Sequence, residues 1–331
     1  MRTTFAKTLL KLAKVNPRIM LLTGDLGYSV FEGFQTVFPK QYLNMGVAEQ
    51  NMTGVAAGLA MEGFAPVIYS IVPFATMRNF EQIRNDICYQ NLNVKIVGVG
   101  AGFSYGAYGH THHGLEDVGI LRTLPNLVII APGDPVEVEL AVRAMMNYKG
   151  PVYLRLGKSG EPVLHKKKPH FKIGKGLLLQ DGKDVTIIAT STMLERAIAV
   201  ARELKRQGER GKGKGDMQSN KNNPIPFTLY PKQISVRLIS MPTIKPLDEK
   251  IIIDSIRKTG ALVTLEEHSM IGGLGSAVAE VVAESGLPVK FKRIAVPDRF
   301  TNVIGLQEYM RKANRLDRES ITETVLNMLT C

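Results

Sequence analysis

The chain has 331 residues, of which 44% are apolar and 22% are charged, and its mean hydropathy is near zero. This composition is typical of globular proteins and excludes collagen, coiled-coil and disordered chains, and the length predicts two domains. The net charge of +12 would suit nucleic acid, a membrane surface or an anionic substrate, but much of the excess lies in residues 166–168 and 205–221. Charge runs of this kind are usually solvated surface, so we expect neither nucleic acid nor a membrane as a partner.

Cysteine content and hydrophobic patterning indicate the compartment. Two cysteines, Cys88 and Cys331, cannot build a disulfide framework, and no CxxC pair suggests structural zinc. The N-terminal residues lack the pattern of a signal peptide, and no run of about 18 apolar residues could span a bilayer. We therefore expect a cytoplasmic protein.

Short apolar runs alternate with helical patterns along the chain. The runs are rich in Val, Ile and Leu without strict alternation, which is typical of parallel strands buried on both faces. We predict strands at residues 19–24, 65–70, 94–98, 127–131, 152–156, 184–189, 235–239, 261–266 and 289–295. We predict helices at residues 136–148, 193–207, 250–259 and 274–285. Alternating strands and helices predict an α/β fold with two open, mostly parallel-sheet domains.

Composition also predicts the domain boundaries. Residues 1–160 form the first predicted domain, and residues 161–182, which are polar and rich in Gly, Pro and Lys, form a linker. Residues 183–331 form the second domain, which a basic loop insertion at residues 208–226 interrupts. We expect this insertion to be a long surface loop.

The segment NMGVAEQNM at residues 44–52 precedes an almost wholly apolar helical pattern. The periodicity predicts a buried helix that begins near Glu49. One interpretation of Glu49 is a carboxylate stabilised by the helix dipole. The other is a carboxylate with apolar neighbours, which makes a good proton donor.

The next segment, at residues 73–84, carries Phe74, Met77 and Phe80 at a spacing of three. By itself this spacing is typical of core side chains on a helix.

A glycine-rich loop at residues 98–114 follows a predicted strand and contains His110, His112 and His113. Loops after parallel strands bind ligands in open α/β sheets, and the glycines indicate tight turns or close approach to a ligand. A metal site would need further ligands that the sequence does not identify. A histidine loop at a pocket rim, for substrate contact or proton transfer, is the other interpretation.

Arg155 lies near the carboxyl end of the predicted strand at residues 152–156. It could hold an anion at the ligand-binding edge of the sheet, or it could form a structural ion pair.

Together these segments resemble the transketolase family of thiamine-diphosphate enzymes, and specifically its pyrimidine-binding and C-terminal domains. The resemblance extends from residue 2 to about residue 326. Its markers, in matching order and spacing, are GDLGYS at 24–29, NMGVAEQNM at 44–52, PFATMRNFEQIRND at 73–86, GHTHHGLED at 109–117, PVYLR at 151–155 and EEHSMIGGLG at 266–275.

The resemblance implies roles for particular residues. Glu49 resembles the family's glutamate that hydrogen-bonds N1′ of the aminopyrimidine and starts the proton exchange that activates the cofactor. Phe74 resembles the aromatic residue that stacks on the pyrimidine ring, which replaces the core interpretation, and Asp25 resembles the aspartate near the thiazolium. Ile71 and Met77 would complete the cofactor pocket. The residues implied in substrate binding are Ser29, His110, His112, Arg155 and Arg2, of which His112 corresponds to the active-site histidine.

Three positions depart from the family pattern. Ile71 stands where the family usually has a first phenylalanine, and Tyr108 stands where it usually has an aspartate that contacts a substrate hydroxyl. A histidine expected near Gly100 is missing. The cofactor half of the site is largely kept and the substrate half is altered, so pentose-phosphate substrates do not follow from the resemblance.

The family's GDG…N motif, which holds the diphosphate and Mg²⁺ on a separate domain, has no counterpart in this sequence. The resemblance therefore implies a split enzyme. This chain would be its C-terminal subunit, without metal ligands of its own, and an N-terminal subunit would supply the diphosphate and Mg²⁺ site in an α2β2 assembly. The implied reaction transfers a two-carbon ketol unit from a ketose, such as a sugar phosphate, to an aldehyde.

Two alternatives stay open. One is an enzyme that uses a 2-oxo acid such as pyruvate, like a dehydrogenase E1 β subunit or deoxyxylulose-phosphate synthase. The other is a non-catalytic regulatory subunit.

Overall fold

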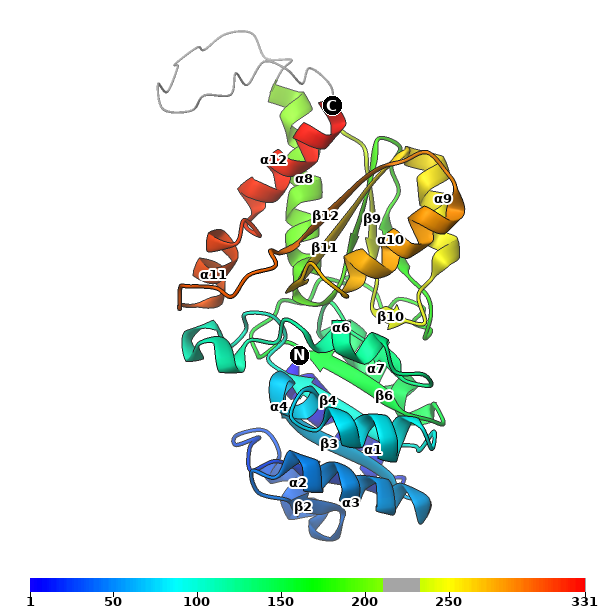
Figure 1. The fold of residues 1–331 in the computed structure, drawn as a ribbon, viewed down its shortest axis with the longest axis vertical. Helices are drawn as coiled ribbons and strands as arrows, with labels where there is room; N and C mark the ends of the chain where they lie inside the picture. The colour runs from blue at the N-terminus through cyan, green and yellow to red at the C-terminus, as the bar shows by residue number, and fades with distance from the viewer. Residues whose placement is uncertain (211–232, 331) are drawn as a thin grey trace.

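The computed structural model describes residues 1–210 and 233–330. Figure 1 shows two α/β units stacked along the long axis of the molecule, with the N-terminal unit below and the C-terminal unit above. Most of the predicted basic loop 208–226 lies outside the described residues. None of the described helices combines the length and apolar character needed to cross a membrane.

The first sheet has seven strands in the order β10-β5-β6-β4-β3-β1-β2. All neighbouring strands in it are parallel except β10 and β5. The strands are β1 (Ile19–Thr23), β2 (Tyr42–Asn44), β3 (Ala65–Ile71), β4 (Lys95–Val99), β5 (Val128–Ile130), β6 (Val152–Leu156) and β10 (Thr243–Lys245).

The second sheet has five strands in the order β12-β11-β8-β9-β7, and only the β7–β9 pair is antiparallel. The strands are β7 (Leu177–Gln180), β8 (Val185–Ala189), β9 (Val236–Ser240), β11 (Ala261–Ser269) and β12 (Lys290–Val296).

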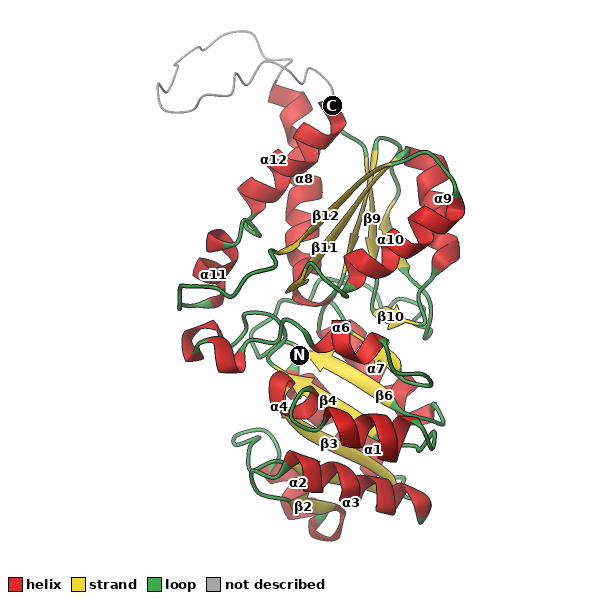
Figure 2. Ribbon diagram, in the orientation of Figure 1, coloured by secondary structure: helices red, strands yellow, loops and turns green. Residues whose placement is uncertain are grey.

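Helices flank the sheets (Figure 2). Those of the first half of the chain are α1 (Arg2–Ala13), α2 (Glu32–Val37), α3 (Glu49–Met61), α4 (Val72–Thr76), α5 (Phe80–Gln82), α6 (Asp117–Arg122) and α7 (Pro135–Asn147). Those of the second half are α8 (Leu194–Arg210), α9 (Glu249–Thr259), α10 (Leu274–Ser285), α11 (Gln307–Ala313) and α12 (Arg318–Thr330). Shorter helical turns are η1 (Pro39–Gln41), η2 (Ile83–Cys88, a π-helix), η3 (Gly106–Tyr108), η4 (His110–His112) and η5 (Ser191–Met193).

All nine predicted strands and all four predicted helices are present within a few residues of their predicted ends. The central strands β1, β4, β6, β8 and β9 are buried at every position. Apolar side chains on both faces therefore form cores against helices on either side, as expected for parallel sheets. The mostly parallel α/β fold class is confirmed.

The two sheets are not independent along the chain. β10 comes from the second half of the sequence but pairs antiparallel with β5, at the edge of the first sheet. The C-terminal part of the predicted linker 161–182 is not linker either, because β7 within it pairs with β9 of the second sheet. Both strands are short edge strands, and their pairing depends on contacts distant in sequence.

Candidate functional site

The carboxyl ends of three neighbouring strands bring the predicted site segments together. β1 ends before Gly24 and Asp25, β3 ends at Ile71 before α4, and β4 ends at Val99 before the glycine-rich loop. Ligands bind at this edge in open α/β sheets.

Glu49 begins α3, as predicted, and its side chain is 1% exposed. Its Oε1 accepts a hydrogen bond from Ser70 Oγ at 2.9 Å, and its Oε2 accepts one from Arg78 at 2.7 Å. A Cβ on Gly24 would lie 3.1 Å from Glu49 Oε1, so a larger side chain at position 24 would crowd the carboxylate. The carboxylate is therefore fixed by donors from two other elements and closely approached by backbone.

Phe74 lies on α4 and is only partly buried, and Met77 is 39% exposed. The interpretation of both as core residues is wrong, because Met77 is exposed and Phe74 contacts Arg78 and His112 instead of a buried apolar cluster. The Phe74 ring meets the Arg78 guanidinium, whose central carbon is 4.3 Å from the ring centroid. It also meets the His112 ring edge-to-face, with centroids 5.3 Å apart. Phe74 thus connects the surroundings of Glu49 to the histidine loop.

The three histidines of the loop contact different partners. His112 lies between Phe74 and Tyr108, whose ring centroid is 5.4 Å away. His110 is exposed and packs against Phe300 of the second unit, with ring centroids 4.4 Å apart. His113 is buried, and burial lowers its pKa. His110 and His113 also meet edge-to-face with ring centroids 5.8 Å apart, but the group of metal-ligand side chains found among residues 1–210 and 233–330 does not include this loop.

Asp25 and Ser29 lie on an exposed turn after β1, and both have left-handed backbone, with φ of 51° and 61°. Asn44 holds the Asp25 carboxylate through its side-chain amide at 3.0 Å, and the hydroxyl of Tyr28 donates to the same oxygen at 3.1 Å. The Ser29 amide donates to Glu32. These hydrogen bonds fix the turn. None of them uses the Ser29 hydroxyl.

The contacts of Arg155 do not fit the expectation that it binds an anion. Its side chain is 2% exposed, and its Nε donates to Asp117 at 2.8 Å. A second nitrogen donates to the carbonyl oxygens of Gly114 and Glu267. Burial alone would raise the pKa of Asp117, but the neighbouring guanidinium outweighs it and the pKa is lowered. Arg155 therefore forms the structural ion pair, which leaves it no surface for a substrate.

The remaining predicted residues lie around these contacts. Ile71 is the N-cap of α4, three residues before Phe74, and is partly buried. Arg2 begins α1 beside the buried phenol of Tyr105. Burial raises the pKa of this phenol, and the positive charge of Arg2 offsets part of that rise. No contact places Arg2 with Glu49 or Phe74 among the described residues.

Ser70 and Arg78 were not identified from sequence as parts of this site. Arg78 stands four residues after Phe74, and this spacing on helical backbone would have indicated that the two side chains meet. Ser70 ends a predicted strand, but a sequence gives no sign that its hydroxyl meets a distant carboxylate.

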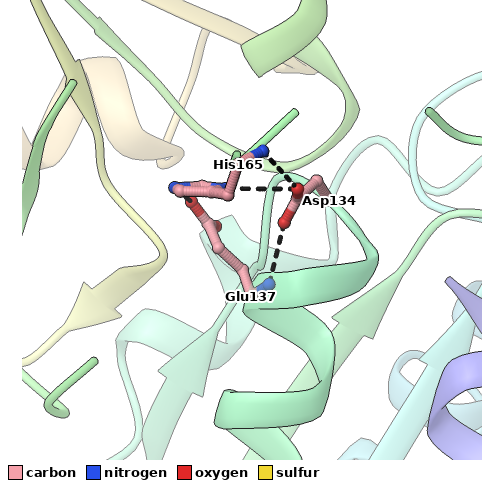
Figure 3. Close-up of side chains that lie close together, drawn as sticks. All are labelled: Asp134, Glu137 and His165. Carbon is pink, nitrogen blue, oxygen red and sulfur yellow. Dashed lines mark hydrogen bonds and ion pairs between the residues drawn. The ribbon is translucent and has the colours of Figure 1, made fainter. Parts of the chain in front are cut away.

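A second cluster of polar side chains joins the start of α7 to the linker (Figure 3). Asp134, Glu137 and His165 are the group of metal-ligand type found in residues 1–210 and 233–330. Asp134 accepts the amides of Glu137, Leu164 and His165, and Glu137 accepts the Gly133 amide and the Ser240 hydroxyl. The His165 nitrogens face different carboxylates, at 3.2 and 3.5 Å. This geometry favours a hydrogen-bonded junction over an ion site.

The residues around Glu49 fit one half of a thiamine-diphosphate site. A buried carboxylate and an aromatic face are spanned by a single planar group, the guanidinium of Arg78. An aminopyrimidine ring is also planar and also carries N–H donors at its edge.

Comparison with known proteins identifies the family. The family description "Transketolase, pyrimidine binding domain" matches residues 1–161, and "Transketolase, C-terminal domain" matches residues 174–211 and 227–321. A Methanocaldococcus jannaschii protein named as a transketolase C-terminal section is 39% identical over 98% of this chain and 95% of its own length. A 6-deoxy-6-sulfo-D-fructose transketolase subunit of Clostridium sp. is 36% identical over 97% of this chain and 92% of its own.

A solved structure gives the same result. It is described as a split gene transketolase, inactive beta4 tetramer, and it superimposes with a TM-score of 0.83 at 36% identity. The match covers 99% of this chain and 97% of the other. This chain therefore belongs to the transketolase family.

Proposed function

We propose that this chain is the C-terminal subunit of a two-chain, thiamine-diphosphate-dependent transketolase. In this proposal it binds the aminopyrimidine of the cofactor and acts in the transfer of a two-carbon ketol unit from a ketose to an aldehyde. The observation that carries the proposal is the buried carboxylate of Glu49, fixed by Ser70 and Arg78 beside the face of Phe74.

Glu49 has the properties required to manage a proton at N1′ of a pyrimidine. It is 1% exposed, so water does not compete for its oxygens. Ser70 Oγ fixes Oε1, and Oε2 accepts from the exposed side chain of Arg78, which a ring donor can replace. Thiamine diphosphate, when bound, supplies the carbanion chemistry and the electron sink. Glu49 would hold and move the proton that switches this chemistry on.

Phe74 would orient the ring, since aromatic groups prefer defined offset-stacked or edge-to-face arrangements. His112, in contact with Phe74, would stand beside the substrate oxygens and donate or accept a proton there. Asp25, held by Asn44, would face the thiazolium side, and Ile71 and Met77 would border the ring. Ser29 and His110 would contact the sugar from the exposed turn and the histidine loop.

The second half of the site would come from a separate N-terminal subunit that holds the diphosphate and Mg²⁺. Relatives matched over almost their whole length carry transketolase-subunit names, and the solved relative is described as inactive as a beta4 tetramer. These names support an enzyme that needs a partner, with α2β2 as the simplest assembly. The same names favour a transketolase over the 2-oxo acid alternative and over a non-catalytic subunit.

Calorimetry with thiamine diphosphate and Mg²⁺ tests the proposal, on this chain alone and on its mixture with the N-terminal subunit. Tight binding only in the mixture, together with ketol transfer to an aldehyde, is the expected result. Release of CO₂ from pyruvate by the mixture would instead support the 2-oxo acid alternative. Absence of binding in the mixture would contradict the cofactor assignment.

A further inference from the structure

Arg78 lies between the two groups that the proposed function assigns to the pyrimidine ring. One terminal nitrogen donates to Glu49 Oε2 at 2.7 Å. The central guanidinium carbon lies 4.3 Å from the centroid of the Phe74 ring. One planar side chain therefore spans the carboxylate and the aromatic face together.

The guanidinium makes the same kinds of contact that an aminopyrimidine protonated at N1′ would make. Both are flat π systems that carry positive charge and N–H donors at their edge, so both suit a carboxylate at the edge and an aromatic ring below. While the guanidinium makes both contacts, neither Glu49 Oε2 nor the face of Phe74 is available to another planar group.

We propose that Arg78 occupies the pyrimidine position of the cofactor-free chain and competes with the cofactor for it. This inference rests on the proposed function, because it assumes that Glu49 and Phe74 hold the pyrimidine. In the free subunit Arg78 neutralises a buried carboxylate that would otherwise stand unpaired, which is costly. When the cofactor binds, the ring replaces the guanidinium at both contacts.

The local structure allows this exchange by rotation of the side chain alone. The Arg78 side chain is 39% exposed, so it has solvent to move into. Its backbone is held in place, since the Arg78 amide donates to Pro73 and the next residue, Asn79, is buried and donates to Thr53 Oγ1 at 2.7 Å. The guanidinium can leave without moving Phe74 or α3.

The variant Arg78→Met tests the inference through two effects of opposite sign. The first is on the chain alone, whose melting temperature should fall because Glu49 loses its counter-charge. The second is on the mixture with the N-terminal subunit, where thiamine diphosphate with Mg²⁺ should bind about tenfold more tightly in calorimetry. A charge-assisted hydrogen bond has the strength to account for that factor.

Arg78→Lys keeps the charge but cannot stack as a plane, and its dissociation constant should lie between those of the wild type and Arg78→Met. Arg84→Met is the matched control, since Arg84 is also exposed on the same segment but donates to Asn85 and not to Glu49. This control should change neither the melting temperature nor the dissociation constant.

Weaker or unchanged cofactor binding by Arg78→Met would overturn the inference, because Arg78 would then assist the cofactor or ignore it. That result leaves the proposed function standing if the wild-type mixture binds. Failure of the wild-type mixture to bind thiamine diphosphate would instead overturn the proposed function, and this inference with it.

Discussion

At the scale of single residues, the buried carboxylate of Glu49 is the most direct target. Gln has the same size and can accept the same hydrogen bond from Ser70. Its neutral amide, however, cannot take up and release a proton as a carboxylate does. We expect Glu49→Gln to lower turnover of the assembled enzyme by about 10²- to 10⁴-fold, the range of general acid–base catalysis. Steady-state kinetics with the N-terminal subunit present measures this.

Glu62→Gln is a matched control, since Glu62 is the exposed C-cap residue at the other end of α3. It should turn over like the wild type. Normal turnover of Glu49→Gln, with the circular dichroism spectrum unchanged, would contradict the role of Glu49.

Lys95 is a buried cation without a carboxylate partner among the described residues. It is 0% exposed, and its Nζ donates to the carbonyl oxygens of Tyr148 and Gly150 at 2.8 and 2.7 Å. Burial lowers the pKa of Lys95 from 10.5 to about 7. Between these values the unfolded chain holds a proton that the folded chain has lost, so the free energy of unfolding rises with pH.

The expected slope from Lys95 is up to about 1.4 kcal/mol per pH unit. Urea unfolding between pH 7 and pH 9 measures it. Lys95→Met should remove this contribution, while Lys149→Met, at a neighbouring exposed position, should retain it. Equal slopes in wild type and Lys95→Met would show that Lys95 keeps its proton in the folded state.

At the scale of elements, the start of α7 combines a helix cap with the attachment of the linker. Burial raises the pKa of Glu137 from 4.5 to about 7, and the Asp134 carboxylate, 3.2 Å from Nδ1, raises the pKa of His165. A group whose pKa is raised by folding stabilises the protein at low pH and loses that effect as the pH rises through the folded value. The contribution of this junction to the free energy of unfolding should therefore fall as the pH rises from 4.5 to 7.

Glu137→Gln should flatten this fall, because the amide stays neutral throughout the range. Unfolding titrations from pH 5 to pH 8 provide the measurement. Glu139→Gln is the control, since Glu139 lies on the same helix but pairs at the surface with Lys168 and Arg143. A Glu137→Gln profile that parallels the wild type would rule out Glu137 as the source.

The same scale shows what sequence predicts of the fold. Strands such as β1 and β6 are buried at all five positions, so their apolar runs are visible without any partner. β2, β7 and β10 have three or four residues and include polar side chains, unlike the equally short β5, whose three residues are all apolar and buried. Their existence depends on a neighbouring strand that offers free hydrogen-bonding groups, which only the folded chain supplies.

The candidate site divides in the same way. The residue types and spacing around Glu49 and Phe74 are local, and they were sufficient to predict where α3 begins and which family the chain resembles. The partners of buried charges are not local. Arg155 meets Asp117, 38 residues earlier, and Arg78 meets Glu49, 29 residues earlier. These pairings decide between a ligand contact and a structural ion pair.

At the scale of the whole molecule, the histidine loop is held by the second unit. Glu267, at the end of β11, accepts the Phe103 amide at 2.7 Å and is paired with Arg311 of α11, and both charged side chains are almost fully buried. Gly102 precedes Phe103 with φ of 61°, and a Cβ there would lie 2.6 Å from the Glu267 side chain. The loop therefore rests on Glu267 so closely that only glycine fits.

Glu267→Ala should lower the free energy of unfolding by about 3–5 kcal/mol, since it leaves the buried Arg311 without its buried carboxylate partner and with only the exposed Glu308 beside it. It should also lower turnover, because the loop that carries His112 loses its support.

Glu308→Ala is the matched control. Glu308 pairs with Nη1 of Arg311 and with Arg196 but is 64% exposed, and such pairs contribute at most about 1 kcal/mol each. Denaturant unfolding and kinetics of both variants, in the assembled enzyme for the kinetics, separate the two effects. If Glu267→Ala lost stability but kept full turnover, the second unit would support the fold of the loop without positioning His112 for the reaction.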